Sequence, residues 1–184
     1  MAHIFQLWAE CKNEESTKRF VDYFRGLEHK LLTGRTIRWT VEVTEPPSYT
    51  PAVVVWSTDL SRYGVRTLQD ALEATEAGLR LYHHLKTAPE FRFARVAWEA
   101  DCLPMADLPE FVEVTTNDGC RLSLKCVVDD ELYTHLGSPK FYDEFRPGYW
   151  WNRYKGESYR PLYSNDQQEL NELCRQLLPE YFSY

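Results

Sequence analysis

Apolar and polar side chains recur with two different periods along the first half of the chain, and these periods predict strands and helices in a definite order. Residues 3–10 are rich in β-forming side chains, and residues 13–34 place apolar side chains at helical spacing. Residues 36–44 alternate strictly, which predicts a strand with one buried and one solvated face. The predicted buried face carries Ile37, Trp39, Val41 and Val43. Residues 52–56 form a continuous apolar run, typical of a strand covered on both faces.

Polar residues that favour helix ends mark the starts of the two predicted helices. Asn13 and Ser16 are candidate N-caps of the first helix. Thr67 and Asp70 resemble a capping box at the start of the second helix, whose apolar positions continue towards Pro89. A strand is expected after Pro89, with a slip of its alternation near Ala94 that indicates a bulge.

The predicted order is βαββαβ, which is the order of the ferredoxin-like split βαβ arrangement. We therefore expect an α+β fold in which residues 1–103 form a ferredoxin-like unit with both helices on one face of a four-stranded sheet. The opposite face of such a sheet is bare, and another segment is needed to cover or use it.

The second half, residues 104–184, is expected to pack on the first half as an extension of one continuous globular domain. Asn117-Asp118-Gly119 lies between two alternating runs, 111–116 and 122–128, and predicts a β-hairpin. Residues 131–136 and 140–145 are each expected to form a short helical turn. An aromatic-rich irregular segment and a C-terminal helix beginning near Ser164 follow.

The aromatic segment, residues 148–163, carries the candidate binding residues. Its rings alternate with basic side chains, a pattern typical of surfaces that stack bases beside phosphate contacts. The candidate ligand- or partner-binding residues are Tyr149, Trp150, Trp151, Arg153, Tyr154, Lys155, Tyr159 and Arg160. Residues 137–163 contain five basic and three acidic side chains, a balance of +2, so the rest of the chain sums to −9. Alternatively, the rings cover the bare face of the sheet while tyrosine hydroxyls and arginine heads reach water.

Composition narrows the remaining possibilities. A net charge of −7 argues against binding DNA or an anionic membrane through the whole surface, because both need a positive field. The five cysteines are widely spread without CxxC spacing, and no apolar run is long enough to span a membrane, so a cytoplasmic location is expected. No metal or cofactor is predicted, because the sequence contains no P-loop, HExxH, GxSxG or GxGxxG motif. His83 and His84 are neighbours on a predicted helix, so they do not converge on one ion.

Three functions remain open at this level. The favoured one is a non-enzymatic interaction or regulatory protein that binds another protein or a second copy of itself. A homodimer through a sheet edge or through the aromatic segment is expected, and residues 36–44 are a candidate edge because they are not interrupted by proline. The alternatives are a single-stranded nucleic-acid binder that uses residues 148–163, and an enzyme with a cleft between the two halves.

Overall fold

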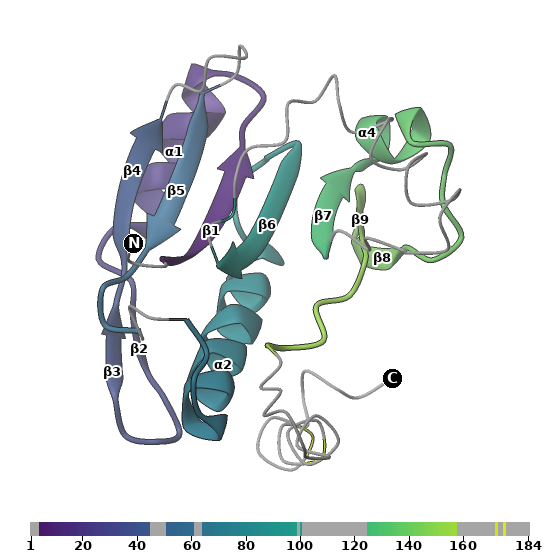
Figure 1. Ribbon diagram of the computed structural model, residues 1–184. Coiled ribbons are helices and arrows are strands. Elements are labelled where there is room, and N and C mark those ends of the chain that lie inside the picture. The colour runs from purple at the N-terminus through teal and green to yellow at the C-terminus, as the bar shows by residue number, and fades with distance from the viewer. Residues whose placement is uncertain are drawn as a thin grey trace.

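The computed structural model describes residues 4–44, 51–60, 64–98, 100, 125–157, 172 and 175, and these residues form a mixed α+β fold built on a large antiparallel sheet (Figure 1). The elements in chain order are β1 (Phe5–Glu10), α1 (Glu14–Phe24), β2 (Glu28–Lys30), β3 (Thr36–Arg38), β4 (Thr40–Thr44), β5 (Ala52–Trp56), α2 (Leu68–Leu85), β6 (Phe93–Trp98), β7 (Cys126–Asp129), α4 (Asp130–His135), β8 (Asp143–Arg146) and β9 (Tyr149–Trp151). No helix in this part of the chain is both long and apolar enough to cross a membrane.

The main sheet has seven strands in the order β4-β5-β1-β6-β7-β9-β8, and each neighbouring pair is antiparallel. β1 lies between β5 and β6, so Leu7 is opposite both Val55 and Val96. β7, β9 and β8 continue the sheet beyond β6. The second half of the chain therefore enlarges the sheet that the first half begins, and β2 and β3 form a separate two-stranded sheet.

The main hydrophobic core lies between the sheet and the helices α1 and α2. Alternate residues of β1 point into it, and Phe5 and Leu7 are fully buried. Phe20 on α1 and Leu81 on α2 belong to the same core, so both helices cover one face of the sheet, as Figure 1 shows. Burial of one such side chain stabilises the fold by about 1.5–3 kcal/mol relative to its exposure.

A second apolar cluster lies on the opposite face of the sheet. Phe93 and Val128 are cross-strand neighbours there, and Leu132 of α4 packs onto them. Trp8 and Trp150 border this cluster and are half-buried. The short helix α4 therefore covers part of the sheet face that was expected to be bare in the first half alone.

Both predicted helix starts are confirmed. Asn13 and Ser16 form a reciprocal capping box on α1, and Thr67 and Asp70 form one on α2. α1 ends earlier than the sequence pattern indicated, because the chain turns at Gly26, which has a φ of +74°. His29 consequently lies in β2 rather than on the helix.

The predicted strand over residues 36–44 is in fact two strands in two sheets. β3 pairs with β2 and β4 pairs with β5, while the N–H of Trp39 leaves both ladders and donates to the carbonyl oxygen of Leu27 at 3.0 Å. Trp39 is buried, whereas Val43 is 51% exposed. The prediction of one uniformly buried face from the strict alternation was therefore wrong.

Three further expectations need correction. Tyr149–Trp151 form a regular strand, so this part of the aromatic segment extends the sheet instead of covering it. β8 occupies the second half of the stretch expected to be a helical turn at residues 140–145, whereas the turn at 131–136 is helical as α4. The β1–β6 register runs without interruption past Ala94, so no bulge is present there.

Two predicted elements fall largely outside the described residues. The hairpin around residues 117–119 is represented by Lys125 and by Cys126–Asp129, which form β7. The C-terminal helix is represented by Glu172 and Arg175, both of which are helical.

Candidate functional site

The predicted aromatic residues of β9 are divided between the two faces of the sheet. Tyr149 and Trp151 point towards the helix-covered face, and Trp150 points to the other face, because side chains alternate along a strand. Trp150 stacks on Tyr133 with ring centres 4.3 Å apart and an interplanar angle of 11°. Its indole N–H donates to Oδ1 of Asp130 at 2.6 Å. This ring is therefore held by α4 on one side and at its polar end.

Tyr149 is buried and joins β9 to the segment that precedes β6. Its hydroxyl accepts a hydrogen bond from the N–H of Phe91 at 3.1 Å and donates to the carbonyl oxygen of Phe91 at 3.0 Å. The guanidinium of Arg146 lies 4.1 Å from the centre of the Tyr149 ring. A tyrosine at this position thus satisfies two main-chain groups that are buried together.

Tyr154 is buried against α2, at a place where the helix has no side chain. A Cβ atom on Gly78 would lie 2.8 Å from the Tyr154 ring. The Tyr154 hydroxyl donates to Oε1 of Glu157 at 2.7 Å, and the N–H of Glu157 donates to the Thr75 hydroxyl at 2.9 Å. Tyr154 and Glu157 are therefore closely packed along one side of α2.

Two ionisable groups near Tyr154 have perturbed pKa values. Burial raises the pKa of the Glu157 carboxyl, which the Tyr154 hydrogen bond and the positive charge of Lys125 partly offset. Burial lowers the pKa of the Lys125 ammonium, and the charge of Glu157 opposes this effect. Each group thus supports the charged form of the other in a partly desolvated position.

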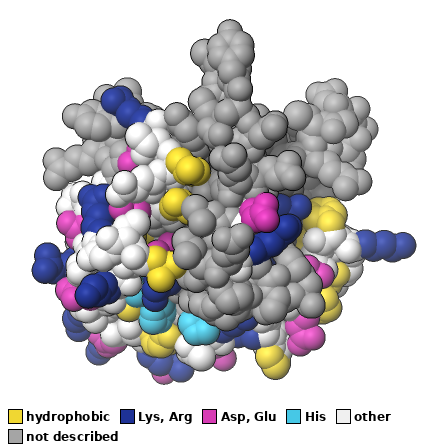
Figure 2. Space-filling model, turned by 90° about the horizontal axis from the view of Figure 1, so that it is seen from below, with side chains coloured by type: hydrophobic (Ala, Val, Ile, Leu, Met, Phe, Trp, Pro, Cys, Tyr) yellow, Lys and Arg dark blue, Asp and Glu magenta, His cyan; other side chains and the backbone are white. Residues whose placement is uncertain are grey.

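The other predicted site residues occupy different settings. Arg153 forms an ion pair with Asp143, with Nε and Oδ2 2.5 Å apart, and Lys155 is exposed. Tyr159 and Arg160 lie outside the described residues. The described rings therefore do not form one exposed row. Figure 2 shows acidic and basic side chains intermixed on the end of the molecule seen from below.

Two histidines, which the sequence did not single out together, meet between α2 and the β2–β3 hairpin. Nε2 of His29 and Nε2 of His84 are 3.0 Å apart. Trp39 Nε1 lies 3.1 Å from Nδ1 of His29, and the Tyr23 hydroxyl lies 3.4 Å from Nδ1 of His84. The Tyr23 hydroxyl is also 2.7 Å from the Thr87 hydroxyl. These side chains connect α1, α2, β2 and the β3–β4 junction.

The indole N–H of Trp39, at one end of this network, determines which nitrogen of each histidine carries a proton. An indole nitrogen only donates, so Nδ1 of His29 accepts from Trp39 and a neutral His29 carries its proton on Nε2. That proton is donated to Nε2 of His84, whose own proton then lies on Nδ1 and faces Tyr23. Every hydrogen bond in this network has one donor and one acceptor when both imidazoles are neutral.

The surroundings of both histidines favour this neutral state. Burial, together with the charges of His84 and Arg80, lowers the pKa of His29 to about 4. The pKa of His84 is also lowered, first by burial and then by His83 and Arg80.

The histidine pair has the geometry of a hydrogen bond rather than of a metal centre. The ring centres are 5.1 Å apart while the Nε2 atoms are 3.0 Å apart, so the rings lie nearly end to end. Two imidazoles on one zinc ion each place nitrogen about 2.0–2.1 Å from the metal, and the end-to-end separation here is too short for an ion between them. Within the described ranges, no group of three or more histidine, cysteine or acidic side chains is arranged to hold a metal.

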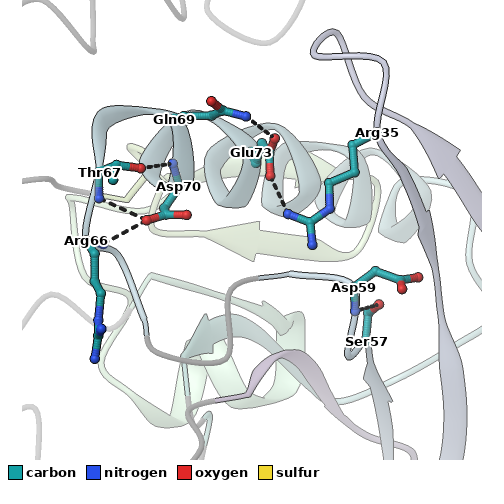
Figure 3. Close-up of polar contacts among 8 residues, drawn as sticks. All are labelled: Arg35, Ser57, Asp59, Arg66, Thr67, Gln69, Asp70 and Glu73. Carbon is teal, nitrogen blue, oxygen red and sulfur yellow. Dashed lines mark hydrogen bonds and ion pairs between the residues drawn. The ribbon is translucent and has the colours of Figure 1, made fainter.

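Acidic residues of α2 fasten the same hairpin at two further points. Arg35 Nη1 reaches Oε2 of Glu73 at 2.8 Å, as Figure 3 shows, and Gln69 donates to the other oxygen of Glu73. Oε2 of Glu76 accepts a hydrogen bond from the N–H of Leu32 at 2.9 Å. The β2–β3 hairpin is thus attached to α2 along several turns of the helix.

The two edges of the seven-stranded sheet differ in character. At one edge, β8 exposes Asp143 and Glu144 and its pairing with β9 shifts register before Arg146, a combination that discourages further strand pairing. At the other edge, β4 is the outermost strand in Figure 1 and pairs with β5 without a register shift. It exposes Val43, and its one charged residue is Glu42.

The two described cysteines are poor candidates for nucleophiles. Cys11 and Cys126 are buried, and burial raises the pKa of their thiols to about 12 and about 11, respectively. A reactive cysteine requires the opposite shift, towards the thiolate.

No family model matches this chain, and no curated protein or solved structure shows significant similarity to it. The basis for a functional assignment is therefore the geometry of the chain itself. The β4 edge is the strongest candidate interaction site in the described structure. The histidine network is the residue set that sequence reasoning missed, because His29 and His84 are 55 positions apart and neither belongs to a local motif.

Proposed function

We propose that this protein is a non-enzymatic interaction protein that binds an extended, basic segment of a partner protein along β4. The observation that carries the proposal is the contrast between the two sheet edges: charges and a register shift protect β8, whereas β4 is regular and exposes an apolar side chain. An unprotected edge presents main-chain donors and acceptors to which another strand can add.

Charge complementarity indicates the kind of partner. Glu42 is at the centre of β4 and is exposed, with Thr40 and Thr44 on the same side of the strand. In antiparallel self-pairing centred on this residue, Glu42 would face its own copy, and like charges directly opposite are destabilising. The net charge of −7 adds general repulsion between two copies. A lysine or arginine on a partner strand would instead form a favourable cross-strand pair with Glu42.

We also propose a finer fold assignment for the first half, although the complete seven-stranded sheet differs in strand order from a four-stranded ferredoxin-like sheet. β4, β5, β1 and β6 are adjacent and antiparallel, and α1 and α2 both pack on one face. We propose that these elements are a ferredoxin-like unit whose sheet is enlarged at β6 by three strands and whose opposite edge, β4, pairs with no further strand among the described residues.

A charge-swap experiment tests the binding proposal. The probe is a short synthetic peptide of alternating valine and threonine with a central lysine, compared with the same peptide carrying glutamate at the centre. We expect the lysine peptide to perturb the backbone amide NMR signals of residues 40–44. Glu42→Lys is expected to reverse the preference several-fold, since a cross-strand charge pair contributes about 0.2–1 kcal/mol. Glu144→Lys on the exposed β8 edge is the matched control and is expected to leave the preference for the lysine peptide unchanged.

Three results would contradict this assignment: equal binding of both peptides by wild-type protein, an absence of perturbation at β4, or a preference that Glu144→Lys reverses. Sedimentation of the wild-type protein and of Val43→Lys provides an independent readout. Self-association that Val43→Lys abolishes would identify a second copy of the chain, rather than a basic partner, as the occupant of β4.

A further inference from the structure

We propose that the hydrogen bond between His29 and His84 is a proton-sensitive latch that holds the β2–β3 hairpin against α2, and that proton uptake by the pair releases the hairpin. This inference does not depend on the proposed binding function. It rests on the arrangement of donors and acceptors around the two imidazoles, which adds to the burial of Leu31 and Ile37 in the main core and to the contacts of Glu73 and Glu76 with the hairpin.

The network contains no position for an additional proton. A second proton on His29 would occupy Nδ1, where the Trp39 N–H already donates at 3.1 Å. A second proton on His84 would occupy Nε2, which accepts from His29 at 3.0 Å. Each added proton therefore removes a hydrogen bond, because two N–H groups would face each other where a donor now meets an acceptor. The two rings, or the strand and helix that carry them, must then separate.

The charged groups around the pair oppose protonation rather than stabilise it. Arg80 and His83 on α2 lower the pKa of His84, and Arg80 also lowers that of His29. Tyr23 from α1 and Trp39 from the β3–β4 junction contribute uncharged groups. In the released state the imidazoles are solvated, so their pKa values return towards the ordinary value of 6.5.

The sign of the pH dependence follows from these shifts. A histidine with a lowered pKa in the closed state binds its proton more readily when the latch is open, so acid favours opening. The closed state is fully favoured above about pH 6.5 and loses its advantage as the pH falls towards about 4, the pKa of buried His29. For uptake of one proton, the opening constant rises about tenfold per pH unit within this window.

Two neighbouring amides distinguish release of the hairpin from its unfolding. The N–H of Leu32 donates to Glu76 across the hairpin–helix contact, whereas the N–H of Leu31 donates to the carbonyl oxygen of Arg35 within the hairpin. After correction for the intrinsic pH dependence of exchange, hydrogen exchange at Leu32 is expected to accelerate about tenfold per unit below pH 6.5. Exchange at Leu31 and in β1 is expected to change much less.

Variants separate the histidines from the carboxylates that also fasten the hairpin. In the double variant His29→Gln/His84→Gln, the glutamine side chains can still accept a hydrogen bond from Trp39 and donate within the network, but they do not titrate. The N–H of Leu32 is therefore expected to remain protected from hydrogen exchange in acid. His135→Gln, on the exposed surface of α4 and away from the pair, is the matched control and is expected to keep the wild-type acid response.

Acid exposure of Leu32 that persists in the double variant would assign the effect to Glu73 and Glu76 and overturn the latch. Equal acceleration at Leu31 and Leu32 would show unfolding of the hairpin and would also contradict it. Nitrogen chemical shifts of the imidazoles in wild-type protein provide a test that does not depend on the variants folding. Near neutral pH they must show His29 protonated on Nε2 and His84 on Nδ1, and any other tautomer pair overturns the network.

Discussion

Tyr149→Phe is expected to reduce the free energy of unfolding by roughly 2–5 kcal/mol, although it removes only one oxygen atom. The lost hydroxyl is bonded to both main-chain groups of Phe91, at 3.1 and 3.0 Å, in a buried position. Phenylalanine leaves that N–H and that carbonyl without partners, and each unsatisfied buried group costs about 1–3 kcal/mol. Equilibrium unfolding in denaturant measures the effect directly.

Tyr133→Phe is the matched control for this substitution. The Tyr133 hydroxyl reaches the carbonyl oxygen of Pro139 at 3.5 Å and is only partly buried, so its removal is expected to cost less than about 1 kcal/mol. Similar losses in the two variants would mean that the contact between Tyr149 and Phe91 does not specifically stabilise the attachment of β9.

Local sequence signals predicted the parts of this fold that depend on neighbouring residues. The capping pairs Asn13–Ser16 and Thr67–Asp70 each span one helical turn, and both helices begin where the pairs indicated. The buried strand β5 was likewise evident from its uninterrupted apolar residues. In these cases the interaction that determines the structure lies within the pattern itself.

Contacts between distant residues explain what the pattern did not reveal. Trp39 leaves the sheet because its main chain bonds to Leu27 and its indole to His29, so an alternating run became two strands. β9 is a strand because β7 offers it a partner, although its aromatic composition resembles an irregular cover. Burial on both faces removes the alternation of apolar and polar residues by which a half-exposed strand is detected.

For the candidate site, too, local sequence signals identified some residues, whereas contacts between distant residues determined their placement. The sequence indicated the aromatic residues 149–151 and 154 but not their placement, which is set by pairing with β7 and by the surface of α2. Pairing within the sheet leaves β4 at one edge, and the expectation that residues 36–44 contain an edge strand agrees with this position. The relation between His29 and His84 required the full tertiary arrangement, since no spacing rule connects a strand residue to a helix residue so far along the chain.

Removal of the Tyr154 ring by Tyr154→Ala is expected to destabilise the fold by about 3–5 kcal/mol, the range for truncating a large buried side chain.

A more specific prediction concerns the substitution Gly78→Ala, because the Tyr154 ring lies directly above Gly78. In the wild-type protein, Gly78→Ala places a methyl group 2.8 Å from the ring, and such overpacking typically costs about 1–3 kcal/mol. In the Tyr154→Ala background the obstacle is absent, and alanine is then favoured over glycine within a helix by about 1 kcal/mol.

The same substitution at Gly78 is therefore expected to destabilise one background and stabilise the other. A double-mutant cycle built from the four unfolding curves measures this reversal and cancels effects on the unfolded chain that both backgrounds share. If Gly78→Ala stabilises the wild-type protein as much as it stabilises Tyr154→Ala, the ring does not occupy the space above Gly78. Tyr154 and Glu157 would then not be held along α2 by this contact, and the contact would not explain the burial that raises the pKa of Glu157.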